Sequence, residues 1–594
     1  MNAPVPTPET AERRAAAPAP AYSRLLGRLP ILSIITWTLI ALVLILMLYP
    51  VTAAVIRAFS ASGQLDFSRL FDILSSSWLP RVFGTTLLTV VAGGGIALFA
   101  ASLFAWLNER TDARLGILAD LLPLVPLLLP TVALAVGWIF LGSPRVGFIN
   151  HWLDLTINRL GLNLSVNIES WGGLVFVYAL FFVPYVYVIV SSALRNMDGS
   201  LEEASRTSGA SLWMTIRSVS LPAIKPALAG GMLLISMVGM GLYSVPAIIA
   251  TRANIDILSV RIIQSIMNEY PPRTDEAVTL AGILMVFIFA VWTIHRRVTR
   301  GGHYSQISGK GNRQSVITLG AWRWPARFLM IVYLLITSIL PVLALLIVSF
   351  QPFWTPLINF DSFTLSHYTR ILFERQITRS ALLNSITLGL LGALTGMLIA
   401  GLFALYIRAK PRLGGIVDSL TKLPSAFSHI VIGIGFLVAF SGPPFHLAGT
   451  ILILFLAYLI LYLPEASIAA NSALSQVSNE LSEASIMSGA GEGRTFWQVV
   501  LPLMLPGMVS GAALVFVLIL GELTASYLLA GVRFPVAGFV IIDIWESGQF
   551  GELAALATSV TLLASGIIAI VFSWLHFYRV SHGLASRSVR RRRK

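Results

Sequence analysis

Two stretches of the chain repeat the same pattern of residue types, and each carries a carboxylate at the same place. Residues 200–222 read SLEEASRTSGASLWMTIRSVSLP, and residues 480–502 read ELSEASIMSGAGEGRTFWQVVLP. In both, a glycine follows the glutamate of Glu-Ala-Ser by six residues, and the proline of a Leu-Pro pair follows it by nineteen. This spacing is typical of a short helix, a glycine that accepts positive φ, and a second short helix ended by proline. The pattern predicts two compact helical projections, each presenting an acidic group.

Two explanations of the repeated glutamate are open. Ser200-x-x-Glu203 has the spacing of a capping box, in which the glutamate would only satisfy a backbone amide. In the second stretch the cap position holds Glu480, which cannot form that box, whereas contact with another protein explains both copies. The candidate contact residues are Glu203, Ala204, Gly209, Leu221 and Pro222 in the first stretch and Glu483, Ala484, Gly489, Leu501 and Pro502 in the second.

A third acidic group lies within or at the edge of an apolar run. Glu522 follows Gly521, and the matching position of the first half holds Leu242. An ionisable residue at membrane depth is a functional candidate, so Glu522 is a candidate for a transport pathway or its gate. The alternative is a paired or hydrated residue near the outer interface. The eight histidines show no metal-ligand spacing, and we expect His429 to be a packed or pore-facing residue.

The residue types needed for several other chemistries are missing from the sequence. Cysteine is absent, which excludes disulfides, thiolate metal sites and thiol catalysis. The one Gly-Lys pair, Gly309-Lys310, precedes another glycine and has Tyr304 where a phosphate-binding loop begins with glycine. No paired carboxylates or Ser/His/Asp set suggests catalysis. We therefore expect no enzymatic site and no metal or cofactor held by this chain.

The composition shows where these groups must be positioned. Of 594 residues, 56% are hydrophobic and 11% charged, with a mean hydropathy of +0.81, whereas soluble domains carry about 25% charged residues. A membrane-spanning helix needs roughly 20 apolar residues. The run 423–464 is too long for one crossing and is divided by a Ser-Gly-Pro-Pro turn, so we expect twelve helices. The charge-free runs are 29–56, 82–108, 121–144, 170–194, 226–251, 277–295, 328–360, 380–407, 423–464, 495–521 and 553–578.

The net charge of +14 comes from two segments that follow apolar runs. Residues 296–327 and 579–594 each contain seven basic residues and no acidic ones. This placement favours an anchor facing anionic lipid headgroups and argues against nucleic-acid binding. With both termini on one side, that side holds 29 Lys and Arg and the other 12, so we expect both termini in the cytoplasm.

The chain is predicted to be a tandem duplication. Matches between the two acidic stretches keep an offset of 280 residues, and further upstream the offset is 298, because the loop around 143–171 is longer in the first half. Six helices per half make the copies parallel, related by a pseudo-twofold axis along the membrane normal. The expected divisions are a disordered tail (1–30), two transmembrane domains (31–298 and 324–579), a basic linker (299–323) and a basic tail (580–594).

The repeated stretches resemble the signature loop of binding-protein-dependent ABC importer permeases, which reads Glu-Ala-Ala-x3-Gly-x9-Ile-x-Leu-Pro. Here Ser205 and Ser485 replace the third residue, and Val219 and Val499 replace the isoleucine. The resemblance, which covers nearly all of 50–580, implies the all-α type I importer fold in a fused form. It implies that each loop is a coupling helix seated in one of two separate ATPase subunits, which bind ATP and Mg²⁺. It also implies a binding protein on the external face and a location in the bacterial inner membrane.

The substrate follows only from the kind of relative. A single chain holding both halves looks like the ferric-iron importer permeases, and like those for thiamine or 2-aminoethylphosphonate. Polyamine systems, which usually use two chains, are less similar. An ion-coupled secondary transporter is the rival from another class, but it gives no reason for two matched cytoplasmic loops. A membrane-embedded enzyme is a third possibility.

Overall fold

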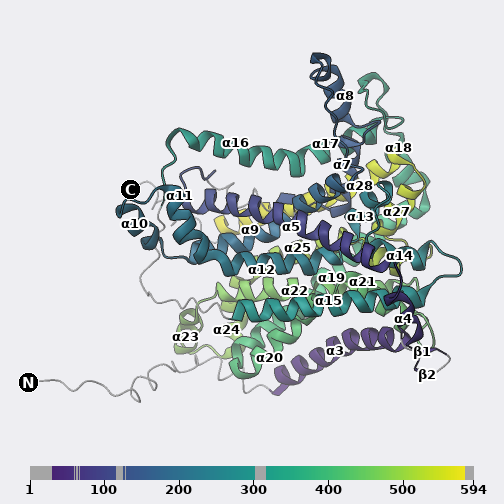
Figure 1. The fold of residues 1–594 in the computed structure, drawn as a ribbon. Coiled ribbons are helices and arrows are strands. Elements are labelled where there is room, and N and C mark those ends of the chain that lie inside the picture. Colours follow the sequence, from purple (N-terminus) through teal and green to yellow (C-terminus); the bar gives the residue numbers. More distant parts are fainter. Residues whose placement is uncertain are drawn as a thin grey trace, which may run out of the picture.

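The computed structural model describes residues 30–58, 60–61, 64–65, 67–115, 125–126, 129–300 and 316–581. Most of residues 1–30, the middle of the basic linker with Gly309-Lys310, and nearly all of the tail 580–594 lie outside these ranges. The described chain is a bundle of long helices whose axes are roughly aligned (Figure 1). Helices suit this composition because only a helix satisfies every backbone amide of a single apolar segment within itself.

The first half contains five long spanning segments and several short elements. It runs α3 (Pro30–Ala58), β1 (Ser60–Ala61), β2 (Gln64–Leu65), α4 (Ser68–Leu74), α5 (Leu79–Arg110), α7 (Thr131–Gly142), α8 (Phe148–Leu155), η2 (Asn158–Leu160), α9 (Trp171–Asn196), α10 (Gly199–Thr207), α11 (Leu212–Thr215), η3 (Ile216–Ser220), α12 (Leu221–Met240), α13 (Ser244–Arg252), α14 (Leu258–Met267) and α15 (Thr274–Arg300). The two short strands pair antiparallel. The extra length of the 143–171 loop forms α8 and η2.

The second half repeats this order. It runs η4 (Gly320–Trp322), α16 (Arg323–Leu334), η5 (Leu335–Ile339), α17 (Leu340–Phe350), η6 (Phe360–Ser362), α18 (Ser366–Thr369), η7 (Arg370–Glu374), α19 (Gln376–Ala409), α20 (Pro411–Thr421), η8 (Leu423–Ala426), α21 (His429–Phe440), α22 (Ile451–Ser475), α23 (Asn479–Met487), α24 (Glu492–Thr495), η9 (Phe496–Val500), α25 (Leu501–Leu520), α26 (Thr524–Leu529), α27 (Ala537–Glu546) and α28 (Phe550–Ser581). The expected turn at 441–444 does separate α21 from α22.

The third segment of each half is shorter than the sequence suggests. Ten helices in the described part of the chain are long and apolar enough to cross a membrane. The third segments, α7 and α21, have twelve residues each, or about 18 Å at 1.5 Å per residue. Prolines precede both, namely Pro126 and Pro130 before α7 and Pro424 before α21. Most residues of α7 and α21 are buried, so protein rather than lipid surrounds both helices.

The two halves interlock through their first helices. Helix α3 packs on α21 of the second half, and α17 packs on α7 of the first half. A Cβ added at Gly137 would lie 2.6 Å from the carbonyl oxygen of Pro341, and one at Gly435 would lie 3.1 Å from that of Pro50. The absence of a side chain at both glycines therefore permits matching close contacts, as expected for two copies related by a pseudo-twofold axis.

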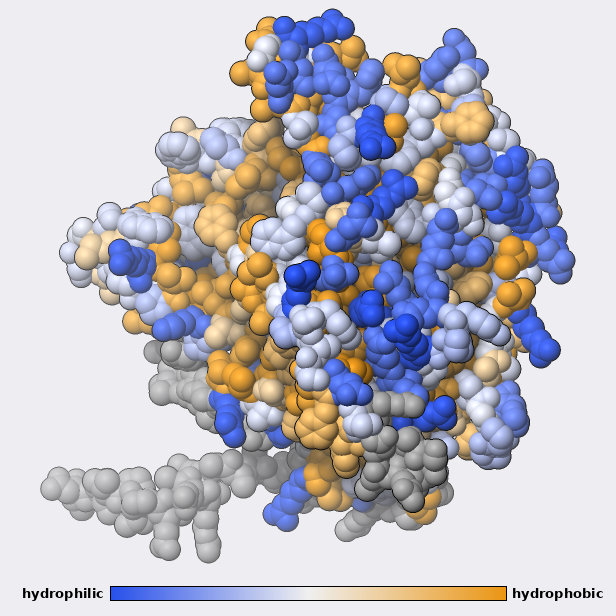
Figure 2. Space-filling model, turned by 45° about the vertical axis from the view of Figure 1, so that its right-hand side comes forward, coloured by the Kyte–Doolittle hydropathy of each residue, from blue (hydrophilic) through white to orange (hydrophobic). Residues whose placement is uncertain are grey.

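The two repeated projections lie at the same end of the bundle. Helices α10 and α11 and the equivalent α23 are at one end in Figure 1, and α8, α18 and α27 are at the other. Figure 2, turned to bring the α8 end forward, shows hydrophilic residues gathered there and hydrophobic residues along the flanks. This distribution fits a polar, solvent-facing end next to a lipid-facing hydrophobic belt.

Candidate functional site

The first projection is a helix–turn–helix beneath α9. Asp198 begins α10 by accepting a hydrogen bond from the amide of Ser200 at 3.0 Å. That hydrogen bond holds the pKa of the Asp198 carboxyl below its usual range. After α10, Gly209 adopts φ = 88°, a left-handed conformation that favours glycine. The predicted glycine turn is therefore present.

Glu203 and Ala204 are exposed on α10. Because Asp198 is the N-cap, the capping box proposed for Ser200 and Glu203 does not form, and that alternative is wrong. The Glu203 side chain points to the surface, where a protein partner can reach it.

The second projection has the same backbone. Ser478 precedes α23, Gly489 adopts φ = 85°, and α24 follows. Glu483 is half-buried and Ala484 is exposed. The boundaries of α10, α11, η3 and α12 recur at an offset of 280 in α23, α24, η9 and α25.

The expectation that proline ends the second short helix is wrong in both copies. Pro222 and Pro502 lie in the first turn of α12 and α25, and the short helices continue into them through the π-helical segments η3 and η9. A proline in a helix clashes with the carbonyl four residues before it. The wider π turn just before each proline relieves that contact and keeps the helix continuous. Each projection is thus one end of a long helix, spanning 212–240 and 493–520 respectively.

Hydroxyl pairs hold each projection together, and sequence reasoning missed them. Ser205 lies 3.1 Å from Thr215, Oγ to Oγ1, and Ser485 lies 2.9 Å from Thr495. These pairs link α10 to α11 and α23 to α24. Ser205 and Ser485, which depart from the family pattern, therefore connect the two short helices of each loop by a hydrogen bond. The sequence signal for these pairs is that a threonine follows each serine by ten residues in both halves, namely Thr215 and Thr495.

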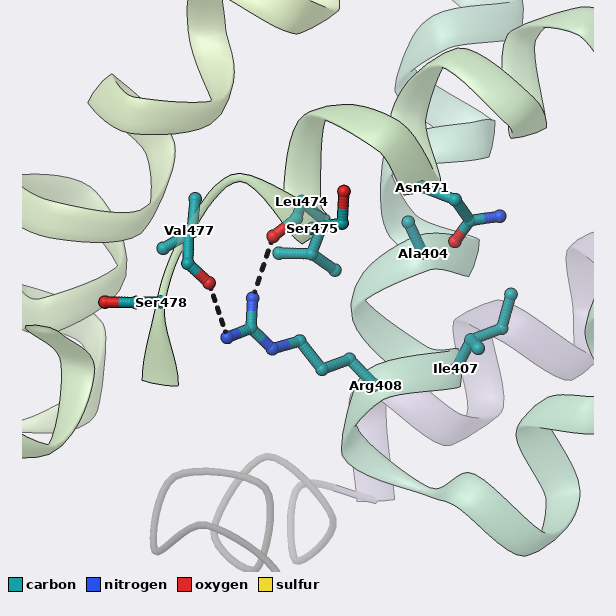
Figure 3. Close-up of a pocket in the computed structure, with 8 residues that line it drawn as sticks. All are labelled: Ala404, Ile407, Arg408, Asn471, Leu474, Ser475, Val477 and Ser478. Atoms are coloured by element: carbon teal, nitrogen blue, oxygen red, sulfur yellow. Dashed lines mark hydrogen bonds between the residues drawn. The ribbon is translucent and has the colours of Figure 1, made fainter. Parts of the chain in front are cut away.

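A pair of arginines, also missed, anchors the projections to the bundle. Arg110, at the end of α5, donates hydrogen bonds to the carbonyls of Leu194 and Met197 at 2.7 and 3.0 Å. Arg408, at the end of α19, donates to the equivalent carbonyls of Leu474 and Val477 at 3.0 and 2.9 Å (Figure 3). Arginine suits this role because its planar fork binds two acceptors at once.

The surroundings of the two arginines differ. In the first half, Glu202 is fully buried, lies 3.5 Å from Arg110 and accepts a hydrogen bond from Ser220 at 2.5 Å. At the equivalent positions the second half has Ser482, also buried, and Val500. One anchor thus includes a buried ion pair, and the other has no acidic residue at the matching position.

A cavity of about 450 Å³ opens beside Arg408. At the equivalent positions the first half has the larger Trp106 for Ala404 and the acidic Glu109 for Ile407. Glu109 accepts hydrogen bonds from Ser191 and Arg195 at 2.6 and 2.7 Å. The cavity of the second half is lined by Ala404, Ile407, Arg408, Asn471, Leu474, Ser475, Val477 and Ser478 (Figure 3).

Glu522 lies in the break between α25 and α26 and is 5% exposed. One carboxylate oxygen, Oε2, is 2.8 Å from Nδ1 of His429 and accepts a hydrogen bond from the Tyr462 hydroxyl at 2.5 Å. The other oxygen, Oε1, accepts from the amide of Ala525 at 2.9 Å, which caps α26. His429 keeps 40% of its side chain accessible. The structure thus joins two sequence candidates, Glu522 and His429, and adds Tyr462, which the sequence did not single out.

This polar cluster lies where the halves meet. Ser428, next to His429, packs against Gly241 of the first half, and Gly521, next to Glu522, packs against Pro130. Tyr243 and Tyr527, one from each half, stack with ring centroids 6.1 Å apart. The accessible face of His429 is therefore close to the interface between the halves.

A second cavity lies at the opposite end of the molecule from the projections. It has a volume of about 970 Å³ and is lined by both halves, including Arg145 and Arg252 from the first and Arg370 and Arg375 from the second. Glu552 pairs with both Arg370 and Arg375, at 3.0 and 2.8 Å. The end of the molecule opposite the projections thus has a cavity lined by more basic than acidic groups.

Comparison with known proteins identifies the family. The model of the "binding-protein-dependent transport system inner membrane component" matches residues 93–298 and 392–580, once in each half. The chain belongs to this family. It is a multi-pass membrane protein and the permease component of an ABC importer, in fused duplicated form.

Several relatives are similar over most of the chain. A ferric transport system permease of Actinobacillus pleuropneumoniae is 24% identical, covering 91% of this chain and 77% of the relative. A probable ABC transporter permease of Sinorhizobium fredii is 26% identical, covering 91% and 94%. A putative 2-aminoethylphosphonate permease of Salmonella choleraesuis is 28% identical but covers 40% of this chain and 89% of the relative. A bacterial alginate importer of known structure aligns with TM-score 0.37 and 18% identity, over 46% of this chain and 98% of that one.

Proposed function

We propose that this permease forms the translocation pathway for ferric iron delivered by an external binding protein, powered by two separate ATPase subunits. The observation that carries the coupling part is the pair of matched projections at one end of the bundle. The similarity to ferric permeases over nine-tenths of the chain supports the cargo.

The projections are built to transmit motion into the bundle. Because α11, η3 and α12 are continuous, as are α24, η9 and α25, a displacement of either projection travels along a helix. Each of these helices ends at a glycine, Gly241 or Gly521, that packs against the other half. Closure of an ATPase pair would thus displace residues at the interface between the two halves. ATP shifts the two access states only through its different affinity for them.

The external cavity supports the delivery step. Arginines of both halves line it, so a binding protein seated there would contact both halves at once. Both termini would then lie on the cytoplasmic side, with the projections.

The coupling proposal is tested by co-purification with the cognate ATPase. Glu203→Lys combined with Glu483→Lys should abolish both co-purification and ATP-dependent uptake of labelled ferric iron in proteoliposomes. Glu374→Lys, the same substitution at one exposed glutamate of η7 at the opposite end, is the control and should leave co-purification with the ATPase unchanged. Undiminished uptake driven by a proton gradient without the ATPase would instead support a secondary transporter.

A second cargo class is favoured by one observation. The 2-aminoethylphosphonate relatives match about the length of one half. Competition of labelled iron uptake by excess 2-aminoethylphosphonate separates the two cargoes. Thiamine and polyamines enter the same competition series as further candidates.

A further inference from the structure

The Glu522, His429 and Tyr462 cluster, named here the polar cluster, gathers donors from three elements. Glu522 comes from the α25–α26 break, His429 begins α21, and Tyr462 lies in α22. Imidazole and phenol both meet one oxygen of the carboxylate. Glu465 follows Tyr462 by three residues on the same helix, which puts it on the same face. Its Oε2 is buried with no hydrogen-bond partner.

The fold does not require the polar cluster. The equivalent residues of the first half are Leu242, Thr131 and Phe182, and Tyr185 stands for Glu465. Helices α7, α12 and α13 nevertheless begin at the positions equivalent to α21, α25 and α26. The same backbone therefore forms without any of these ionisable groups. Since an ionisable side chain at membrane depth is costly, its presence in one half alone indicates a role other than folding.

We propose that the polar cluster is a transient binding site for a hard, highly charged metal cation, ferric iron, on its way between the halves. This inference rests on the proposed function. Carboxylate, imidazole and phenolate are oxygen and nitrogen donors suited to iron, and no soft thiolate is present. The accessible face of His429 provides entry, and the unpartnered oxygen of Glu465 supplies a further donor from α22. On binding, Fe³⁺ replaces the hydroxyl proton of Tyr462, which leaves to water.

The arrangement of donors in the polar cluster favours transient binding of the cation over permanent binding. Among the described residues, no group of three or more His, Cys, Asp and Glu side chains is placed to hold a metal. The donors hydrogen-bond to one another in this structure, so an arriving cation must displace the His429 and Tyr462 contacts to Glu522. A site in a pathway must bind strongly enough to admit the ion and weakly enough to release it. A site whose donors re-pair when it empties meets that condition.

The test uses ferric nitrilotriacetate titrated into the purified full chain in lipid nanodiscs. A phenolate bound to Fe³⁺ gives a visible charge-transfer absorption, which carboxylate and imidazole alone do not give. The wild type should develop this band at one iron per chain. Tyr462→Phe should remove it. Glu522→Gln should weaken apparent affinity by about tenfold or more, since losing even a supporting partner costs about that much.

Tyr458→Phe is the matched control. Tyr458 lies one turn before Tyr462 on α22, and its hydroxyl is 2.7 Å from Ser526 Oγ, so its loss should leave the band unchanged. Size-exclusion profiles and thermal unfolding establish that each variant is folded. A wild type without the band, or a band that survives in Tyr462→Phe, overturns the proposal. In either case the co-purification result for Glu203→Lys with Glu483→Lys decides the proposed function separately.

Discussion

The two projections are anchored to the bundle at Arg110 and at Arg408, named here the first and the second root. The two roots share a backbone geometry but differ in their side chains. At both, an arginine binds two carbonyls at the end of the preceding helix. Around Arg110 the first half adds the buried Glu202, whereas a cavity opens beside Arg408 in the second half. The carbonyl contacts thus suffice for the geometry. We expect the additional carboxylates of the first root, Glu202 and Glu109, to affect its stability rather than its shape.

The interior shows the reverse distribution. There the second half carries the ionisable groups, Glu522 and His429, and the first half has Leu242 and Thr131. Each half therefore has buried charge where the other does without it. A duplicated fold lets one copy keep the packing while the other acquires polar groups, because the interlocking glycines Gly137 and Gly435 are common to both.

The largest expected difference between the halves concerns the two anchoring arginines. Arg110→Leu leaves the fully buried Glu202 carboxyl without its cation, which should cost about 3–5 kcal/mol of unfolding free energy. Arg408→Leu removes hydrogen bonds donated by a charged group and should cost about 1.5–3 kcal/mol. Denaturant titration of the purified variants in detergent measures both. Adding Glu202→Gln to Arg110→Leu should restore part of the loss. Equal costs for the two single variants would show that the buried ion pair contributes nothing.

The interlocking glycines should give the next largest effect. Gly137→Ala places a Cβ 2.6 Å from the carbonyl of Pro341, so the backbone must move, at a cost of about 1–3 kcal/mol. Gly435→Ala meets Pro50 at 3.1 Å and should cost less. Gly282, for which an added Cβ would meet nothing within 4 Å, is a matched helix control in α15. If Gly137→Ala is as stable as Gly282→Ala, the close contact between α7 and α17 is not required.

The hydroxyl pairs of the projections should have a smaller effect, equal in the two halves. Ser205→Ala and Ser485→Ala each remove one partly buried hydrogen bond, worth about 1 kcal/mol. Amide exchange in α10 and α23 should quicken without a change in the rest of the bundle. Ser218→Ala, whose hydroxyl bonds only to the Met214 carbonyl of its own helix, is the control for Ser205→Ala. Faster exchange in only one projection would show that the two loops are not equivalently locked.

Most of the fold follows from the sequence because apolar length and repetition are local signals. The duplication, the glycine turns at Gly209 and Gly489, and the ten long apolar helices among the twelve expected were predictable in this way. The continuous helices through Pro222 and Pro502 were not, because a π turn depends on hydrogen-bond register that residue types do not reveal. The division of residues 411–440 into α20, η8 and α21 was not predictable, because apolar length does not show where a buried segment changes its hydrogen-bonding pattern.

The candidate sites were predictable in part. Glu522 stood out as an acidic residue in an apolar run, but its partners His429 and Tyr462 lie 93 and 60 residues away and only tertiary packing joins them. Arg110 and Arg408 do coincide at the offset of 298, so comparison of the halves could have found them. Their difference in surroundings depends on Glu202, which lies beside the exposed Glu203 and points the opposite way.

The smallest expected effect on the unfolding free energy comes from introducing the ion pair of the first root into the second root. Ile407→Glu with Ser475→Arg introduces the equivalents of Glu109 and Arg195 into the cavity beside Arg408. Because the new pair would remain partly exposed, as Arg195 is now, it should change the unfolding free energy by about 0–1 kcal/mol. Ile407→Glu alone is the control and should be less stable than the pair. If the root is where the halves differ in stiffness, amide exchange in α23 should slow in the double variant toward that of α10. Unchanged exchange in α23 would show that the Glu109–Arg195 pair does not set the exchange rate, and would leave the buried Glu202 contact and the Trp106 side chain as the remaining differences.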